Sequence, residues 1–336
     1  MTRCVRITAL LVVALALSGC GLASGDENEL TIYSGRSSDL VEPLLSEFAE
    51  SSGIPIAVRY GDSTDLALLL AEEGDRSPAD VFFSQSPGTV GFLGEKGLLA
   101  PLAADLVEPV PAAYRSGNNT WVGVTARQRV LVYNSDEVAE SDLPESVLDL
   151  TAPEYRGRVA VAPSNASFQD FVTAMRQQIG EDETLAWLQG MAANESPVYD
   201  SNNAIVEAVG RGEVTLGLVN HYYNERFLAE DPSLPSRNYR FPGGDIGSLV
   251  IESSASILAA SDKREEATKF IEFLLQRSSQ EFFVDETFEY PLVEGITAAD
   301  PLPALPSLES PEIDVDDLGS GFVATQELIE RSGIAD

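Results

Sequence analysis

The sequence predicts an α/β fold of two lobes, each a mostly parallel sheet flanked by helices. Short β-favouring runs alternate with helical patterns from residue 29 to about residue 97, and the same alternation returns between residues 158 and 230. This rhythm is typical of parallel sheets with right-handed crossovers. Two longer β-favouring runs, 121–133 and 249–259, are placed to cross from one lobe to the other.

Residues 1–19 are typical of an export signal. Arg3 and Arg6 precede an apolar stretch that is too short to span a membrane as a mature helix. Leu17-Ser-Gly-Cys20 is similar to the lipobox of bacterial lipoproteins, which implies cleavage before Cys20 and lipidation of its sulfur. An ordinary secretory signal with an incidental cysteine is the alternative. We expect residues 20–29 to tether the protein to the extracytoplasmic face of the cell membrane.

The chain is strongly acidic. It has 21 basic and 54 acidic residues and a formal net charge of −33, which makes nucleic acid and anionic membrane surfaces poor partners. A solvated acidic face explains this charge without any ligand. Once the signal is removed, Cys20 is the only cysteine, so we expect no internal disulfide. No catalytic motif is apparent, and we expect a monomer that is not an enzyme.

Three predicted strands of the first lobe are each followed by a small, hydroxyl-rich turn. The turns are Ser34-Gly-Arg-Ser-Ser38, Gly61-Asp-Ser-Thr64 and Ser84-Gln-Ser86. If the strands are neighbours, these turns line one rim of the sheet, where ligands bind in α/β folds. Each turn alone is explained as a helix N-cap, but three together favour a polar site for an anion or a ligated metal.

Two adjacent tyrosines, Tyr222 and Tyr223, follow an apolar, β-favouring run at 214–219 and precede a helical pattern at 225–230. Two phenol oxygens at such a position are candidate ligands for a hard cation, which lowers the pKa of a phenol that it binds. The alternative is that both rings only pack. We expect the single histidine, His221, to pack or cap rather than to bind a metal.

Arg127 and Arg129 lie on the same face of the long strand at 121–133. One of them is a candidate bidentate clamp for an anion, and we expect the other to form a structural ion pair. Asn220, directly before the tyrosine pair, is a favourable N-cap residue for the helix that follows.

Together these segments resemble the bacterial periplasmic ferric-ion-binding proteins, the substrate-binding components of iron ABC transporters. The resemblance covers residues 30–293. Its landmarks are Tyr33-Ser-Gly-Arg36, residues 73–83 (EGDRSPADVFF), residues 97–102 (GLLAPL), Arg129-Val-Leu-Val-Tyr133, residues 147–150 (VLDL), Asn220-His-Tyr-Tyr223 and Glu289-Tyr-Pro-Leu292.

The resemblance implies a type II-like periplasmic-binding clamshell that captures Fe³⁺ with a synergistic carbonate or bicarbonate and delivers it to an ABC permease. Lobe 1 is then expected at residues 30–126 plus about 250–300, and lobe 2 at 127–249 plus the C-terminal helices. The same fold binding an oxyanion, a phosphonate or a small organic cation is the alternative.

The resemblance also assigns residues to the site. Tyr222 and Tyr223 match the paired tyrosinate ligands of the family. Some relatives have a His and an acidic ligand where this chain has Ser37 and Gln85, and the segment 163–168 lacks the third tyrosine of others. Tyr60 is therefore the best candidate for a third phenolate, with Tyr33 next. The positions expected to hold the anion are Arg36, Ser37, Arg127, Asn165, Ala166, Ser167, Asn202 and Asn220, with Gln85 on the rim of lobe 1.

Overall fold

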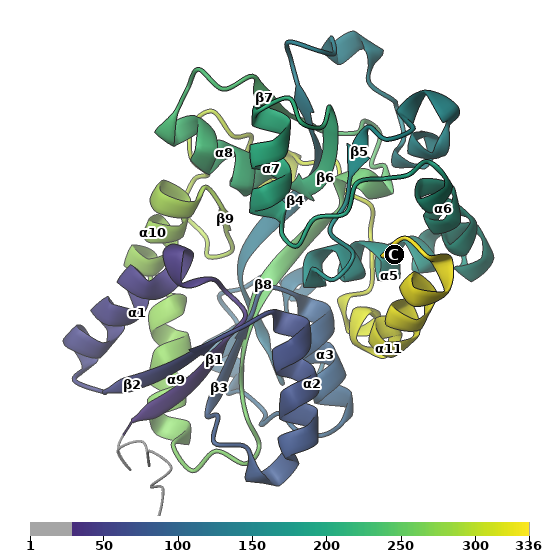
Figure 1. Cartoon of the computed structure of the whole chain (residues 1–336). Coiled ribbons are helices and arrows are strands. Elements are labelled where there is room, and N and C mark those ends of the chain that lie inside the picture. The colour runs from purple at the N-terminus through teal and green to yellow at the C-terminus, as the bar shows by residue number, and fades with distance from the viewer. Residues whose placement is uncertain (1–28, 336) are drawn as a thin grey trace, which may run out of the picture.

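The computed structural model describes residues 29–335, so the predicted signal, Cys20 and most of the predicted tether lie outside the described residues. Figure 1 shows two halves, one above the other, joined by strands that run through the middle of the molecule. Between residues 29 and 335, no helix is both long enough and apolar enough to cross a membrane.

The lower half in Figure 1 contains a parallel sheet, as predicted. Its strands are β1 (Leu30–Ser34), β2 (Ile56–Tyr60) and β3 (Val81–Ser84), and β1 pairs in parallel with both others. The surrounding helices are α1 (Ser38–Ser52), α2 (Ser63–Glu73), α3 (Pro87–Glu95), the short α4 (Ala104–Val107) and α9 (Arg264–Leu274). Helix α1 ends as predicted at Gly53, whose φ of 71° is a conformation that glycine adopts without strain.

Two antiparallel strands connect the halves, which confirms the two predicted crossing runs. They are β4 (Val122–Asn134) and β8 (Val250–Ile257), and every residue of both is buried. Because β8 pairs with β3 and β4 pairs with β6, one sheet of order β2-β1-β3-β8-β4-β6-β5 runs through the whole molecule. The short strands β7 (Ser236–Tyr239) and β9 (Tyr290–Pro291) also pair with β4.

The upper half repeats the alternation of strands and helices. Strands β5 (Val159–Ala160) and β6 (Leu216–Asn220) are parallel, and helices α5 (Ala166–Ile179), α6 (Glu181–Ala193), α7 (Asn202–Gly210) and α8 (His221–Glu230) surround them. A Cβ atom on Gly217 of β6 would lie 2.2 Å from Cγ2 of Ile205 on α7. The glycine therefore allows α7 to pack directly on the strand that leads to the tyrosine pair.

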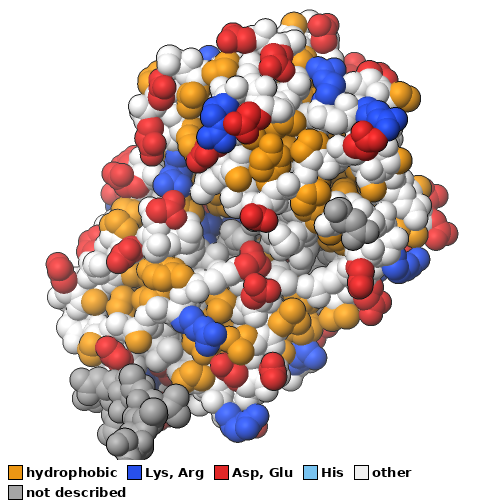
Figure 2. Space-filling model, in the orientation of Figure 1, with side chains coloured by type: hydrophobic (Ala, Val, Ile, Leu, Met, Phe, Trp, Pro, Cys, Tyr) orange, Lys and Arg blue, Asp and Glu red, His pale blue; other side chains and the backbone are white. Residues whose placement is uncertain are grey.

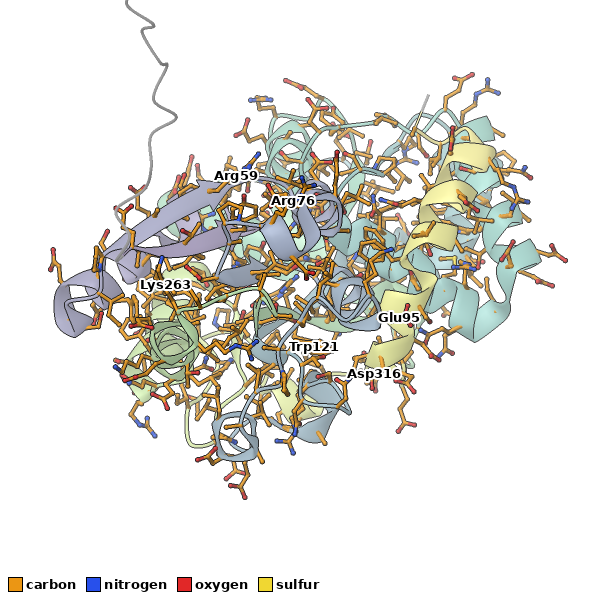
Figure 3. The ribbon with its side chains drawn as sticks, turned by 90° about the horizontal axis from the view of Figure 1, so that it is seen from below. Arg59, Arg76, Glu95, Trp121, Lys263 and Asp316 are labelled. Atoms are coloured by element: carbon orange, nitrogen blue, oxygen red, sulfur yellow. The ribbon has the colours of Figure 1, made fainter. Side chains whose placement is uncertain are left out.

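Three helices differ from the sequence prediction. Helix α8 begins at His221 rather than at residue 225, so both tyrosines lie in its first turn. Helix α10 (Arg277–Thr287) was not predicted, and α11 (Val315–Ser332) begins well before residue 324. Helix α11 lies along α3 of the lower half and also packs on α5 of the upper half (Figure 3). A Cβ atom on Gly319 would lie 2.4 Å from the backbone of Gly91, so this contact needs glycine.

Candidate functional site

The three hydroxyl-rich turns of the lower half meet at one edge of the sheet, as predicted. Strand β1 lies between β2 and β3, so the carboxyl ends of the three strands are adjacent. The backbone N–H of Gln85 donates to Oγ of Ser63 at 3.0 Å, and a Cβ atom on Gly35 would lie only 1.8 Å from that oxygen. The Gln85 side chain is largely buried, whereas Ser37 is exposed at the start of α1.

Tyr222 and Tyr223 stack on each other at the start of α8. Their ring centroids are 4.1 Å apart, Tyr222 is fully buried and Tyr223 is 7% exposed. The Tyr222 hydroxyl has no hydrogen-bond partner within residues 29–335, and such an orphaned buried group calls for an explanation. Burial, and next the neighbouring Tyr223, raises the pKa of Tyr222 well above its usual range. The phenol therefore stays neutral until a cation displaces its proton.

Buried guanidinium groups surround this pair. The Arg36 guanidinium carbon lies 5.8 Å from the Tyr222 ring centroid, and its Nη2 bonds Glu289 at 2.5 Å, with both side chains fully buried. Arg127 is also fully buried, but none of its three guanidinium nitrogens has a partner in the described chain. Burial, followed by the charge of Arg36, lowers the pKa of Arg127. An unpaired buried charge is costly, and this planar fork of donors matches an anion that binds through two oxygens.

Predicted anion-binding residues of the upper half form one hydrogen-bonded cluster. Oδ1 of Asn165 accepts from the Ser167 backbone N–H at 3.1 Å, from the Ser167 hydroxyl at 2.6 Å and from the Asn202 amide at 3.2 Å. Ala166 is the first residue of α5, directly after the N-cap Asn165. The cluster thus joins the first turns of α5 and α7, where backbone N–H groups favour an anion.

Arg129 corrects one prediction, and Asn220 confirms another in its position but not in its side-chain bond. Arg129 forms no ion pair with any residue between 29 and 335; its Nη1 donates instead to Oγ of Ser167 and Oδ1 of Asn220, each at 3.4 Å. Burial lowers the pKa of Arg129 to about 9. Asn220 occupies the N-cap position of α8, but its side chain accepts from Arg129 and does not cap the helix. Through Arg129, Asn220 joins the Asn165 cluster.

The two candidates for a third phenolate have different surroundings. Tyr60 ends β2 opposite Ser34 and is 38% exposed, and its hydroxyl has no hydrogen-bond partner among the described residues. The Tyr33 hydroxyl donates to Glu73 at 3.2 Å and accepts from Arg59 at 3.3 Å. The Tyr33 oxygen is already engaged, and a ligand role for Tyr60 stays a prediction.

His221 is held by the fold through both ring nitrogens. Its Nδ1 accepts from the backbone N–H of Gln128 at 3.2 Å, and its Nε2 lies 2.9 Å from the Phe288 carbonyl oxygen, to which it donates in the neutral tautomer. Burial lowers the pKa of His221 to about 3. The ring therefore anchors the start of α8 as a neutral imidazole, in line with the predicted packing role.

Three buried carboxyl groups near the site were not predicted. Glu289 pairs with Arg36, Asp170 of α5 accepts from the Ser86 hydroxyl, and Glu252 of β8 has no partner for either oxygen among residues 29–335. Burial raises the pKa of Asp170 to about 7 and that of Glu252 to about 8. Only Glu289 had a sequence signal, because it lies in the segment 289–292 that carries the family resemblance.

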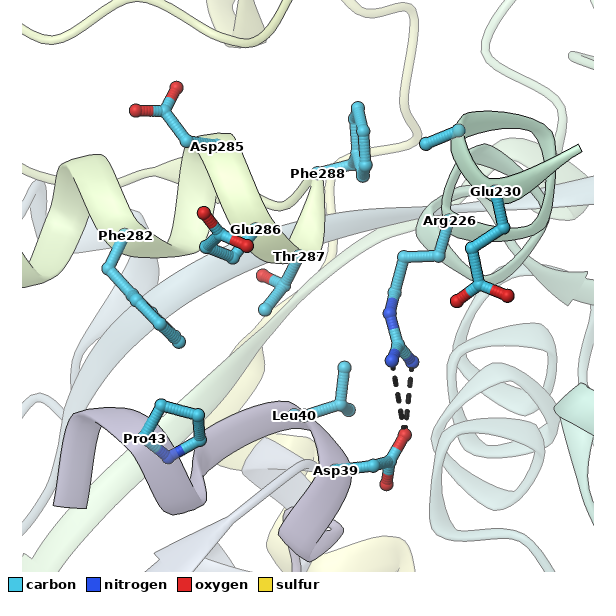
Figure 4. A pocket seen from close by; sticks show the side chains of 11 residues that line it. Asp39, Leu40, Pro43, Arg226, Glu230, Phe282, Asp285, Glu286, Thr287 and Phe288 are labelled. Atoms are coloured by element: carbon cyan, nitrogen blue, oxygen red, sulfur yellow. Dashed lines mark hydrogen bonds and ion pairs between the residues drawn. The ribbon is translucent and has the colours of Figure 1, made fainter. Parts of the chain in front are cut away.

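The surface between the halves has a pocket of about 590 Å³ next to α8 (Figure 4). Helices α1, α8 and α10 line it, and both terminal nitrogens of Arg226 on α8 bond Oδ2 of Asp39 on α1 at 3.2 Å. This pair links the two halves at the surface. Figure 2 shows acidic side chains scattered over this face of the molecule rather than gathered in one patch.

Within the described part of the chain, no group of three or more His, Cys, Asp or Glu side chains is arranged to hold a metal ion. The Tyr222–Tyr223 pair stays the candidate for cation ligands.

Comparison with known proteins identifies the family. Residues 76–312 match the bacterial extracellular solute-binding protein family. The chain is 33% identical to the Fe(3+)-binding periplasmic protein of Serratia marcescens, over 98% of this chain and 99% of that protein. It is 31% identical to the major ferric iron-binding protein of Neisseria meningitidis serogroup B, over 97% of this chain and 98% of that protein.

A solved structure supports the same family. Iron-bound HitA from Pseudomonas aeruginosa matches with a TM-score of 0.87 and 33% identity, over 91% of this chain and 99% of that chain. Fold and site thus define an extracellular solute-binding protein. Within that class, the chain belongs to the ferric-ion-binding periplasmic proteins, which confirms the predicted family and the predicted clamshell fold.

Proposed function

We propose that this protein captures a ferric ion together with a synergistic anion between its two halves and delivers it to an ABC permease. The observation that carries the proposal is a stacked, buried tyrosine pair beside the fully buried Arg127, whose guanidinium has no partner among the described residues. Relatives named as ferric-binding proteins, which this chain matches over nearly their whole length, support the proposal.

Charge explains why arginines surround a site for a cation. Fe³⁺ bound by the phenolates of Tyr222 and Tyr223 keeps a unit positive charge, so a carbonate or bicarbonate completes the neutralisation. Arg127 would hold that anion, together with the cluster of Asn165 and Ser167 at the start of α5. Three buried guanidiniums would oppose a bare cation, but they favour a cation that arrives with an anion and ionises two phenols.

The first test is an absorbance titration with ferric citrate in bicarbonate buffer. Wild-type protein should develop a broad visible band from tyrosinate-to-iron charge transfer, and Tyr222→Phe should lose it. Tyr155→Phe, which changes a half-exposed tyrosine on another part of the surface, is the matched control and should keep the band. If wild-type protein shows no band at any bicarbonate concentration, ferric binding is refuted.

The same arginines make an oxyanion or a phosphonate the second candidate cargo. Such a ligand needs the Arg127 guanidinium and the N-terminus of α5, but it gains nothing from ionisation of Tyr222 and Tyr223. Thermal unfolding separates the two candidates. A rise in melting temperature with phosphate or a phosphonate, without iron and equally in Tyr222→Phe, would favour the second cargo.

We also propose where the protein works. Its family is extracellular, and the lipobox-like segment suggests anchoring through lipid on Cys20, followed by the tether at 20–29. Labelling of cells with a radioactive fatty acid should mark the wild-type protein and not Cys20→Ala. The predicted division into lobe 1 (30–126 plus about 250–300) and lobe 2 (127–249 plus the C-terminal helices), and the monomeric state, belong to the same proposal. Size-exclusion chromatography with light scattering tests the monomer.

A further inference from the structure

Helix α5 of the upper half contacts the lower half through two neighbouring side chains. Oγ1 of Thr64, in the first turn of α2, donates to Oε1 of Gln169 at 3.0 Å. Oγ of Ser86, directly before α3, donates to Oδ2 of Asp170 at 2.5 Å. All four side chains are at least nine-tenths buried. These bonds connect helices that follow β2, β3 and β5, and they do so at the rim that carries the three hydroxyl-rich turns.

The Asp170 carboxyl lies against the start of α3. Ser86 is the N-cap residue of α3, but its side chain makes no capping bond and donates to Asp170 instead. A Cβ atom on Gly88 would lie 2.3 Å from Oδ1 of Asp170, so this approach needs glycine. A carboxyl group from the upper half thus bonds the N-cap residue of a helix of the lower half.

This contact is electrostatically connected to the candidate site. Arg127 and Arg129 both act on the Asp170 carboxyl, which lies on α5 one turn beyond Ser167. The first turn of α5 is the part of the upper half that we assign to the anion. An anion that holds the start of α5 would therefore also fix the segment that bonds Ser86 at the start of α3.

We propose that Asp170 is a positioning residue that latches the two halves over the cargo by accepting a hydrogen bond from Ser86 at the start of α3. The proposal rests on the proposed function, since the cargo retained is the ferric ion with its anion. Asp170 does not contact the cargo in this scheme. It sets how long the halves stay together, and hence the rate at which the cargo leaves.

The test is the release of iron from the loaded full-length protein to excess chelator, followed as decay of the visible band. At a pH above the Asp170 pKa of about 7, where the carboxyl is ionised, Asp170→Ala and Ser86→Ala should each accelerate release by about tenfold or more, as expected for loss of a hydrogen bond to a charged group. Because both variants break one bond, the double variant should release no faster than the faster single variant. Asp170→Asn keeps an oxygen that can accept from the Ser86 hydroxyl and should lie between wild-type and Asp170→Ala.

Asp39→Asn is the matched control. It also breaks a link between the halves, but this link is a surface ion pair in which the Asp39 side chain is 52% exposed, and such pairs contribute little. We expect its release rate to stay within about twofold of wild type. Small-angle scattering provides a second readout: iron-loaded Asp170→Ala should be more expanded than iron-loaded wild type, whereas iron-loaded Asp39→Asn should not.

The outcomes separate the latch from the proposed function. A normal band with wild-type release rates in both Asp170→Ala and Ser86→Ala overturns the latch and leaves ferric binding intact. Effects that multiply in the double variant also overturn it, because the two side chains would then act independently. If wild-type protein shows no band, ferric binding fails and retention of iron by Asp170 fails with it. Circular dichroism of each variant checks that the fold is kept, and Ser86→Ala removes only one oxygen.

Discussion

Arg127 should oppose the stability of the cargo-free protein while supporting capture of the cargo. Its guanidinium is fully buried, has no partner among the described residues and lies near the charge of Arg36. Replacing buried ionic groups by apolar side chains of similar size stabilises proteins by about 1–4 kcal/mol in known cases. We therefore expect Arg127→Met to raise the free energy of unfolding of the cargo-free protein by an amount in that range.

The same substitution should weaken capture. A hydrogen bond to a charged group contributes about 1.5–3 kcal/mol, so loss of one such bond to the anion should weaken ferric binding by about 10- to 150-fold. Urea denaturation of the cargo-free protein gives the first quantity, and a ferric titration at fixed bicarbonate gives the second.

Arg36→Met is the matched control, with the opposite sign for stability. Arg36 is equally buried but bonds Glu289, and removal of one partner of a buried pair destabilises by about 3–5 kcal/mol. If Arg127→Met destabilises the cargo-free protein as Arg36→Met does, or if it leaves ferric affinity unchanged, the reasoning about an unsatisfied anion clamp is wrong.

Three further predictions concern pH, the third ligand and packing. Because burial raises the pKa of Glu252 to about 8, the folded chain keeps a proton that the unfolded chain loses. As the pH rises from about 5 to about 7.5, this group should therefore lower the free energy of unfolding by about 1.4 kcal/mol per pH unit. In urea denaturation, Glu252→Gln should be more stable than wild type by a margin that widens with pH, and a margin that stays constant would contradict this. Tyr60→Phe should shift the visible band of the ferric protein while Tyr33→Phe leaves it in place; an unmoved band in Tyr60→Phe excludes that ligand. Gly319→Ala forces a Cβ atom against the Gly91 backbone and should cost about 1–3 kcal/mol in thermal unfolding; an unchanged melting temperature would show that α3 and α11 separate freely.

Local sequence patterns were sufficient for much of the fold. Strands β1, β2 and β3 and the turns that follow them were predicted from alternating strands and helices punctuated by glycine and serine, which are short-range signals, whereas the order β2-β1-β3 comes from the structure. The two crossing strands were recognisable because their β-favouring runs are longer than those of the other strands. The approach of Ser63 to Gln85 then needed only the correct strand order.

The helix boundaries that were missed depend on packing. Residues 221–224 (HYYN) have weak intrinsic helix propensity, yet burial of all four side chains makes them the first turn of α8. The start of α11 has a capping Asp314 and two acids in its first turn, but Gly319 and Gly321 weaken the helical pattern. Tertiary contacts with α3 and α5 stabilise a helix that its local sequence does not predict.

The polar contacts of the site were predicted only by residue type. Asn165, Ser167 and Asn202 do converge, but the partners of Arg129 are neutral, whereas an ion pair was expected. The bond from Ser86 to Asp170 joins residues 84 positions apart. No spacing rule covers such a contact, because it depends on how two separate halves are placed by the crossing strands.

In the proposed function, cargo capture and closure are one event. The Tyr222 hydroxyl and the Arg127 guanidinium lack partners in the described chain, and in the proposed function each would gain one when a cation and an anion lie between the halves. The fully buried strands β4 and β8 fix Arg127 and Arg129 in place, so the site does not collapse to pair them internally. Separation of the halves returns these groups to water and breaks the bond between Ser86 and Asp170 together with the surface pair of Asp39 and Arg226. A permease that pulls the halves apart would thus remove the reason for binding and the latch in the same movement.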